Sequence, residues 1–201
     1  MTAQDKILYV ANKLGLTSLK DMQASTGAVY DVDTDHSGQI FSSASRHQNP
    51  AVTNLTQNQF EVNEALLVES IAFYNFDNED GNQLENIQQE YGSNAVIVFD
   101  LIIGNKRTMK STPVFGSGTP FTFATSGIQN LAPAATSAIA PRNQIFLEGA
   151  GILIPPQVQW YVEYQIFNMV TGAVIPTDEP ARNIGCYLFG TRVLLNFNTS
   201  I

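Results

Sequence analysis

The stretch that decides the fold is residues 144–167, QIFLEGAGILIPPQVQWYVEYQIF. Its second half alternates between apolar and polar side chains, a pattern typical of a β-strand that is buried on one face. The apolar positions are Val158, Trp160, Val162, Tyr164 and Ile166, and the polar ones are Gln159, Glu163 and Gln165. The sequence therefore predicts a strand over residues 158–166, with Trp160 buried between two sheets.

The first half of the same stretch holds two short apolar runs, Ile145–Leu147 and Ile152–Ile154. A glycine-containing turn signal, residues 149–151, separates them, so both runs are expected to be short strands. Pro155 and Pro156 follow directly, and because proline cannot donate a ladder hydrogen bond they mark a strand end or a sheet edge.

Further strands are expected on both sides of this block. Residues 95–103 are apolar on both faces except at Asp100, which favours a central strand covered on both sides. Residues 104–107 form a hairpin loop, residues 108–115 return as the partner strand, and residues 184–189 and 191–197 form a last pair joined at Gly190 by a bend or bulge. Residues 60–76 fit a helix or a strand, but Ile71 and Phe73 favour the strand.

Irregular segments, and not helices, separate these strands, and their number is about eight. This pattern predicts an all-β protein, an antiparallel β-sandwich of jelly-roll-like type, with an immunoglobulin-like sandwich as the next alternative.

The N-terminus is expected to be helical. Ile7, Val10, Ala11 and Leu14 recur at helical spacing, and Gly15 is a plausible stop. A second short helix or turn is expected to end at Gln23. We therefore divide the chain into a helical N-terminal arm, residues 1–30, and a sandwich domain, residues 31–201. The arm can dock on its own domain, which we favour, or on a neighbouring subunit.

Composition excludes several classes of protein. The 201 residues carry a net charge of −8, which argues against nucleic-acid binding because that requires Lys and Arg. Charged residues are only 14% of the chain, and neutral polar residues replace them, which suits extensive protein contacts. We expect no membrane span, no signal peptide and hence folding in a cytoplasm, and a buried structural thiol at Cys186.

One loop resembles a calcium site. Residues 33–40 match the first eight positions of an EF-hand loop, with Asp33, Asp35 and Ser37 at positions one, three and five. The twelfth position is Ala44, which lacks the bidentate carboxylate, so we expect a calcium ion to be bound weakly if at all. The alternative is an aspartate-rich turn that is held by hydrogen bonds from side chains to the backbone.

No catalytic motif is found, and we expect no catalytic residues, no cofactor and no metal. Glu148 and Glu163 are a possible carboxylate pair for glycoside hydrolysis, but two solvated side chains are the favoured interpretation. Trp160, Tyr161 and Tyr164 are a possible sugar-stacking platform, but the alternation assigns Trp160 and Tyr164 to the core.

Several of these segments together resemble the jelly-roll minor or auxiliary capsid proteins of bacteriophages. They are residues 145–148 (IFLE), residues 151–156 (GILIPP), the strand Val158–Ile166 and residues 190–195 (GTRVLL). The resemblance implies a non-enzymatic virion component that is assembled in the host cytoplasm. Its partners would be other capsid subunits in a symmetric homo-oligomer, with residues 1–30 as an anchoring arm.

Two other functions stay open from the sequence. The first is a carbohydrate-binding β-sandwich module, with calcium bound by Asp33 and Asp35 as a possible stabiliser. The second is a β-sandwich hydrolase, which is the least favoured because no catalytic signature supports it.

Overall fold

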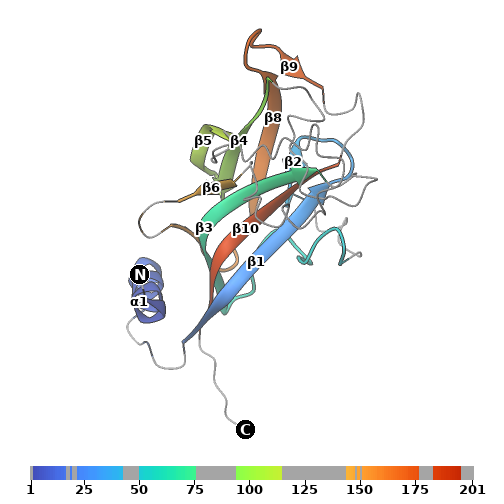
Figure 1. Ribbon diagram of the computed structural model, residues 1–201. Coiled ribbons are helices and arrows are strands. Elements are labelled where there is room, and N and C mark those ends of the chain that lie inside the picture. Colours follow the sequence, from blue (N-terminus) through green and yellow to red (C-terminus); the bar gives the residue numbers. More distant parts are fainter. Residues whose placement is uncertain are drawn as a thin grey trace, which may run out of the picture.

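The computed structural model describes residues 2–16, 19, 22–42, 50–75, 94–114, 144–147, 149, 151–176 and 183–195. These residues form one helix and ten strands (Figure 1). The elements are α1 (Ala3–Leu14), β1 (Gln23–Asp33), β2 (Gln39–Ile40), β3 (Glu64–Asn75), β4 (Ala95–Ile103), β5 (Lys106–Val114), β6 (Gln144–Phe146), β7 (Ile152–Ile154), β8 (Trp160–Asn168), β9 (Val174–Ile175) and β10 (Ile184–Leu194).

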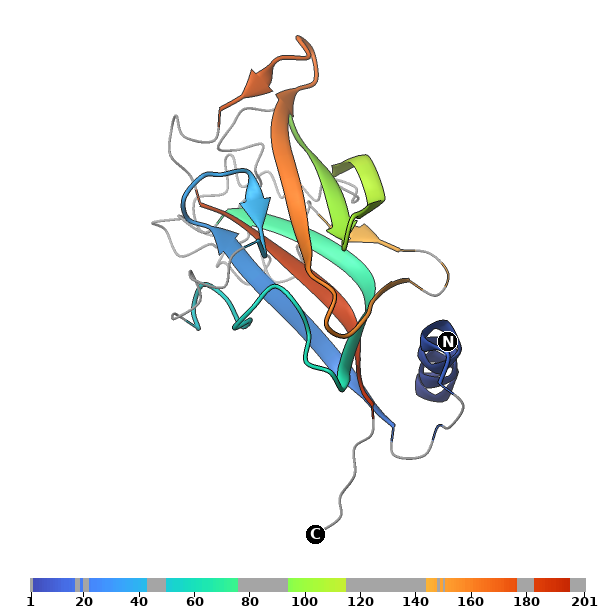
Figure 2. The same ribbon diagram turned by 180° about the vertical axis from the view of Figure 1, so that it is seen from behind.

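The strands make two antiparallel sheets that pack against each other (Figures 1 and 2). The first sheet has the order β1-β10-β3-β6, with β7 also paired to β3. The second sheet has the order β2-β8-β4-β5, with β9 also paired to β8. The predicted all-β antiparallel sandwich with a short N-terminal helix is therefore confirmed.

The pairing between the strands is nested. Strand β1 pairs with β10, β2 with β8, β3 with both β6 and β7, and β4 with the strand that follows it, β5. The early strands of the chain thus pair with the late ones in reverse order. The chain has the connectivity of one long antiparallel hairpin, and the β10–β3 and β8–β4 pairs fold that hairpin into two layers.

The core lies between the two sheets and is apolar. Strand β8 supplies Trp160, Val162, Tyr164 and Ile166, all buried, as the alternation predicts. Trp160 is 0% exposed and its ring packs against Phe41 and Phe60. Cys186 on β10 is also fully buried, in agreement with a structural thiol. The core of the β-sandwich is therefore filled by side chains from its strands and from the connecting residues Phe41 and Phe60.

Helix α1 begins at a capping box and ends at a glycine. Thr2 accepts a hydrogen bond from the Asp5 N–H, and the Asp5 carboxylate accepts one from the Thr2 N–H in return. Gly15 ends the helix in the left-handed conformation, with φ 69°. Among the described residues, no helix is both long and apolar enough to cross a membrane.

The helix packs on the outer face of its own first sheet. Val10 and Ala11 are its buried residues, and they join a second apolar cluster that includes Leu67 and Val193. Lys6 forms an ion pair with Glu69 at 2.5 Å, between Nζ and Oε1, and donates a hydrogen bond to the Thr191 hydroxyl at 3.0 Å. This is the docking on the same domain that the sequence analysis favoured.

Two expectations about secondary structure need correction. Residues 23–30 were placed in a helical arm, but strand β1 begins at Gln23 and pairs with β10 along its whole length. Backbone pairing to β10 overrides the absence of apolar alternation there, as tertiary context often does. The expected last pair of strands is one continuous strand, β10, with a bulge between Phe189 and Gly190 in its pairing to β3. A side chain at Gly190 would collide with the Leu67 carbonyl, so glycine permits the bulge.

Candidate functional site

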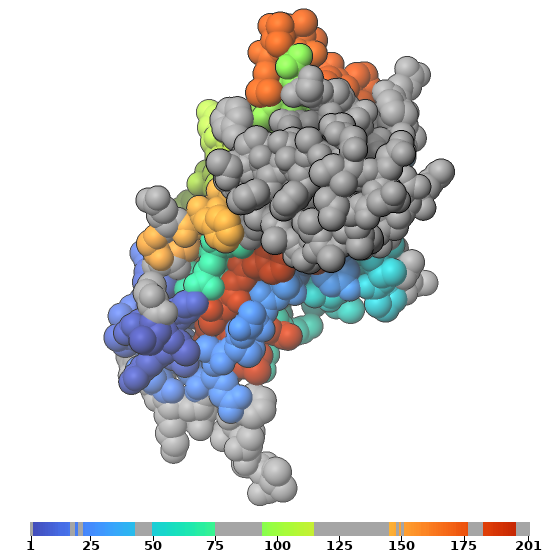
Figure 3. Space-filling model, viewed as in Figure 1, coloured from blue at the N-terminus to red at the C-terminus, as the bar shows by residue number. Residues whose placement is uncertain are grey.

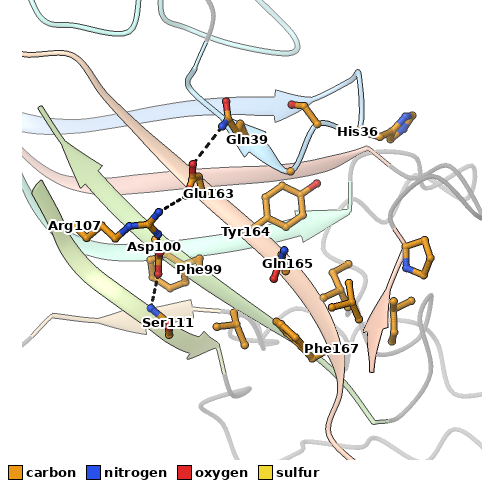
Figure 4. A pocket seen from close by; sticks show the side chains of 17 residues that line it. His36, Gln39, Phe99, Asp100, Arg107, Ser111, Glu163, Tyr164, Gln165 and Phe167 are labelled. Carbon is orange, nitrogen blue, oxygen red and sulfur yellow. Dashed lines mark hydrogen bonds and ion pairs between the residues drawn. The ribbon is translucent and has the colours of Figure 1, made fainter. Parts of the chain in front are cut away.

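A polar groove of about 700 Å³ lies on the outer face of the second sheet (Figure 4). Its floor comes from β2, β8, β4 and β5, and residues 174–176 contribute one wall. Its polar side chains are His36, Gln39, Asp100, Arg107, Ser111, Glu163 and Gln165, whereas Phe167 and Val174 add an apolar part. This groove brings acidic, basic and neutral polar side chains together on one surface.

A row of polar residues crosses the four strands of the groove. Gln39 on β2 lies opposite Glu163 on β8, and Glu163 lies opposite Asp100 on β4. The Gln39 side-chain amide donates to Glu163 Oε1 at 3.3 Å, and the Ser111 backbone N–H donates to the Asp100 carboxylate. The register of the sheet therefore places two carboxylates side by side, each with a hydrogen-bond donor from the next strand.

Arg107 bridges this pair of carboxylates. Its guanidinium contacts the Asp100 carboxylate and reaches Glu163 Oε2 at 3.2 Å from the other terminal nitrogen (Figure 4). Like charges directly opposite each other in a sheet are destabilising, and the planar fork of arginine can serve both. Both carboxylates contact the same cation, so the cluster joins three strands and offsets one of its two negative charges.

Bulges in β5 aim the donors at Asp100. The register of β4 against β5 shifts between Phe99 and Leu101, so that Asp100 faces two residues of β5. One of them, Ser111, adopts a positive φ of 45°, which is uncommon for a residue other than glycine. Bulges re-aim side chains and backbone groups, and this one turns the Ser111 N–H toward the carboxylate.

The loop that resembles a calcium site is an aspartate-held turn. Asp33 is buried and accepts hydrogen bonds from the backbone N–H groups of Ser37 and Gly38, at 3.1 and 2.7 Å, and from the Tyr164 hydroxyl at 3.0 Å. Asp35 also accepts from the Ser37 N–H, at 3.3 Å. The structure therefore shows the hydrogen-bonded turn that the sequence analysis gave as the alternative.

Burial raises the pKa of Asp33, and a hydrogen bond with Asp35 raises it further, against the lowering effect of the N–H and hydroxyl donors. The expected twelfth calcium position, Ala44, lies outside the described residues. Within the part of the chain that the structure describes, no group of three or more His, Cys, Asp or Glu side chains is placed to hold a metal ion.

The other predicted candidates do not assemble into a site. Glu148 lies outside the described residues, and Glu163 faces Asp100 instead. Trp160 and Tyr164 are buried in the core, as the alternation indicated, so they offer no exposed platform with Tyr161. Burial raises the pKa of the Cys186 thiol, as the nearby Asp31 does, and this keeps the thiol protonated and unreactive.

Sequence reasoning missed the groove because it depends on register. Asp100 is the only charge in an apolar strand, and Arg107 lies in the expected hairpin loop. No sequence pattern indicates that the two side chains meet. The pairing Asp100–Glu163 follows only once β4 is known to lie beside β8.

Comparisons with protein-family models, with curated proteins and with solved structures find no match for this chain.

Proposed function

We propose that the protein is a structural subunit of a virion, a capsid or capsid-decorating protein that acts through contacts with other subunits. The nested pairing of the strands carries this proposal. The strand orders β1-β10-β3-β6 and β2-β8-β4-β5 support a jelly roll, the fold that viral capsid domains share with lectins and cupins. Because a fold alone does not specify a function, the choice among these classes has to come from the surfaces.

The interior supports an assembly role over a role in binding small ligands between the sheets. The core of the sandwich is packed with apolar side chains from both sheets, including Trp160, Phe73 and Phe99. A barrel or sandwich that holds a ligand inside needs a cavity lined by a few polar groups. Function in this protein is therefore sought on its outer surfaces, where contacts with partners are made.

The hairpin between β8 and β9 supports subunit contacts. It carries three exposed apolar side chains, Met169, Val170 and Val174, which are 47%, 74% and 53% exposed. The hairpin projects from one end of the molecule, away from α1 (Figure 3). Grouped apolar side chains on a projecting element are typical of a protein-binding surface.

A carbohydrate-binding module is the alternative, and the structure gives it less support. Its main signature, an aromatic platform, is directed into the core at Trp160 and Tyr164. The polar groove around Asp100 and Glu163 remains as a possible sugar site, since such side chains bind hydroxyl groups. A glycan array with the purified protein separates this alternative from the proposal, which predicts no glycan-dependent signal.

The experiment that tests the proposal is a measurement of mass and shape. We expect light scattering and negative-stain electron microscopy of the purified protein to show a concentration-dependent symmetric assembly. Val170→Glu should reduce assembly without lowering the melting temperature, whereas Thr108→Glu, a similarly exposed change on β5, should leave assembly unchanged. A protein that stays a 22.0 kDa monomer at every concentration would overturn the proposal.

A further inference from the structure

The free edges of the two sheets differ in how they are protected. Unpaired edges invite pairing with another chain, and proteins block them with short strands, Lys, Pro or bulges. Edge strand β5 is protected by lysines (Lys106 and Lys110), by a proline (Pro113) and by two register shifts. Strands β2, β6, β7 and β9 are two or three residues long. Strand β1 is 11 residues long and contains neither Lys, Arg nor Pro.

The second half of β1 is covered by a polar side chain that takes the place of a strand. The Tyr30 N–H donates to the Asn54 side-chain carbonyl at 2.9 Å, and the Asn54 side-chain amide donates to the Ala28 carbonyl at 2.8 Å. The Asn54 backbone N–H and the Thr53 hydroxyl both donate to the Tyr30 carbonyl, at 3.3 and 3.0 Å. This cap ends at Ala28.

Among the residues that the structure describes, none covers the first half of β1 in this way. Because Tyr30 and Ala28 direct backbone groups away from β10, the alternation of an antiparallel strand directs those of Thr26 and Ala24 the same way. Within the described ranges, no chain segment makes hydrogen bonds to these outward groups of Thr26 and Ala24. A groove of about 470 Å³ lies between residues 54–61 and the face that β1, β10 and β3 share, and Glu64, Leu66 and Arg192 also line it. Helix α1 packs on the outer face of this sheet, in an apolar cluster that includes Ala24 (Figures 1 and 2).

We propose that residues 24–28 of β1 pair antiparallel with the same residues of a second copy, about a two-fold axis at Thr26. An antiparallel edge is complementary to itself when its outward groups are symmetric about one residue. Thr26 would then exchange two hydrogen bonds with its own copy, and Ala24 would pair with Ala28 of the second copy. The Ala28 carbonyl can accept a second hydrogen bond because it has two lone pairs.

The chemistry of this edge fits a second copy of the chain. Residues 23–28, QASTGA, carry no charge, although the whole chain has a net charge of −8. Two copies can therefore bring these edges together without placing like charges in register. The small side chains also permit close approach of the two strands. This β1–β1 pairing would be one of the subunit contacts in the assembly proposed above, and the inference rests on that proposed function.

A cysteine at the two-fold axis tests the geometry directly. Hydrogen-bonded residues that face each other in an antiparallel pair have Cα atoms about 5.5 Å apart, within the range for a disulfide. Cys186 is the only native cysteine and is fully buried, so Thr26→Cys creates the only accessible thiol. We expect Thr26→Cys to give a disulfide-linked dimer under mild oxidation, and Thr108→Cys on the blocked β5 edge to give none.

Proline variants test the same contact without a covalent bond. Thr26→Pro removes an outward N–H that β10 does not use, so it should abolish the contact and keep the fold. Ser25→Pro removes an N–H that points to β10, so it should lower the melting temperature. If Thr26→Pro does not fold, Thr26→Lys replaces it as the test. This variant keeps the N–H but places two like charges next to each other at the axis, so it should also weaken the contact.

The outcomes separate this inference from the proposed function. Cross-linking at Thr26, with loss of association in Thr26→Pro or Thr26→Lys, supports the contact. A wild-type protein that assembles while Thr26→Cys does not cross-link, and while both edge variants assemble normally, overturns the β1 contact alone. A wild-type protein that never associates overturns both the contact and the assembly role.

Discussion

Asp100 and Glu163 lie directly opposite each other on β4 and β8, with the guanidinium of Arg107 in contact with both carboxylates. The two acids are held together by strand register, so neither can move away from the other when the cation is removed. Arg107 is about half exposed, whereas Asp100 is mostly covered. The stability of this part of the second sheet should therefore depend on one surface arginine.

The first prediction concerns this cation. Arg107→Gln should lower the free energy of unfolding by about 1 kcal/mol, because an attractive cross-strand arrangement becomes a repulsive one. The loss should shrink at high salt, which screens both the attraction and the repulsion. Lys106→Gln is the control, because it removes the same charge from an exposed residue one position away. Urea unfolding at low and high salt measures both; equal effects of the two variants would contradict the prediction.

The second prediction concerns Trp160, the only tryptophan in the chain. Its side chain is fully buried against Phe41 and Phe60, so Trp160→Ala should cost about 3–5 kcal/mol. Among the described residues the indole N–H has no hydrogen-bond partner, so Trp160→Phe loses only packing and should cost clearly less. Native fluorescence should have its maximum at the short wavelength of a buried indole. A maximum typical of indole in water would show that the ring is exposed.

The strands that could be predicted from the sequence are those in which burial determines the order of apolar and polar residues. Strand β8 alternates because one face is in the core, whereas β4 is apolar on both faces, and Val96 and Ile102 on its outer face are buried as well. Residues 23–28 give no such signal, since half of β1 borders solvent and its side chains are small and polar. That half is a strand because β10 supplies its backbone partners, which are 160 or more residues away in the chain.

The sequence indicates individual residues of the groove, but it does not indicate that they lie together. A charge at Asp100 in an apolar strand, and an arginine in the hairpin after it, are local signals. Their meeting with Glu163 and Gln39 depends on strand order and register, which periodicity does not contain. The bulge at Ser111 depends likewise on how β5 pairs with β4, and no residue type in that segment marks it.

The third prediction concerns pH and Asp33. Its pKa in the folded protein is raised from the usual 3.8, first by burial and then by Asp35, so the folded state binds this proton more tightly than the unfolded state. The contribution of Asp33 to stability is therefore fully present below pH 3.8 and is lost as pH rises through the folded pKa. The difference in unfolding free energy between wild type and Asp33→Asn should accordingly favour wild type more at acid than at neutral pH. A difference that grows with rising pH would contradict this sign.

Calcium should have little effect on the same turn. The Asp33 oxygens already accept hydrogen bonds from Ser37, Gly38 and Tyr164, and a calcium ion would have to displace these donors. A ligand stabilises a protein only in proportion to its concentration relative to its Kd for the folded state. We expect the melting temperature to be the same in millimolar calcium and in chelator. An increase with calcium that disappears in Asp33→Asn would show that the loop binds the ion.

The last prediction concerns helix α1, whose docking site the structure places on its own sheet. Val10 is fully buried there, so Val10→Ala should lower the free energy of unfolding by about 1–2 kcal/mol for the two methyl groups removed from an apolar site. Leu8 is 46% exposed on the same helix, and Leu8→Ala is the control, with an effect within about 0.5 kcal/mol.

Deletion of residues 1–16 should lower the melting temperature, because it exposes Leu67 and Val193 to water and removes the ion pair between Lys6 and Glu69. Thermal melts and light scattering on the same samples decide where the helix docks. If the truncated protein melts like the wild type but no longer assembles, α1 docks on a neighbouring copy. If it melts at a lower temperature and still assembles at a temperature where it is folded, α1 belongs to its own domain and the anchoring arm is excluded.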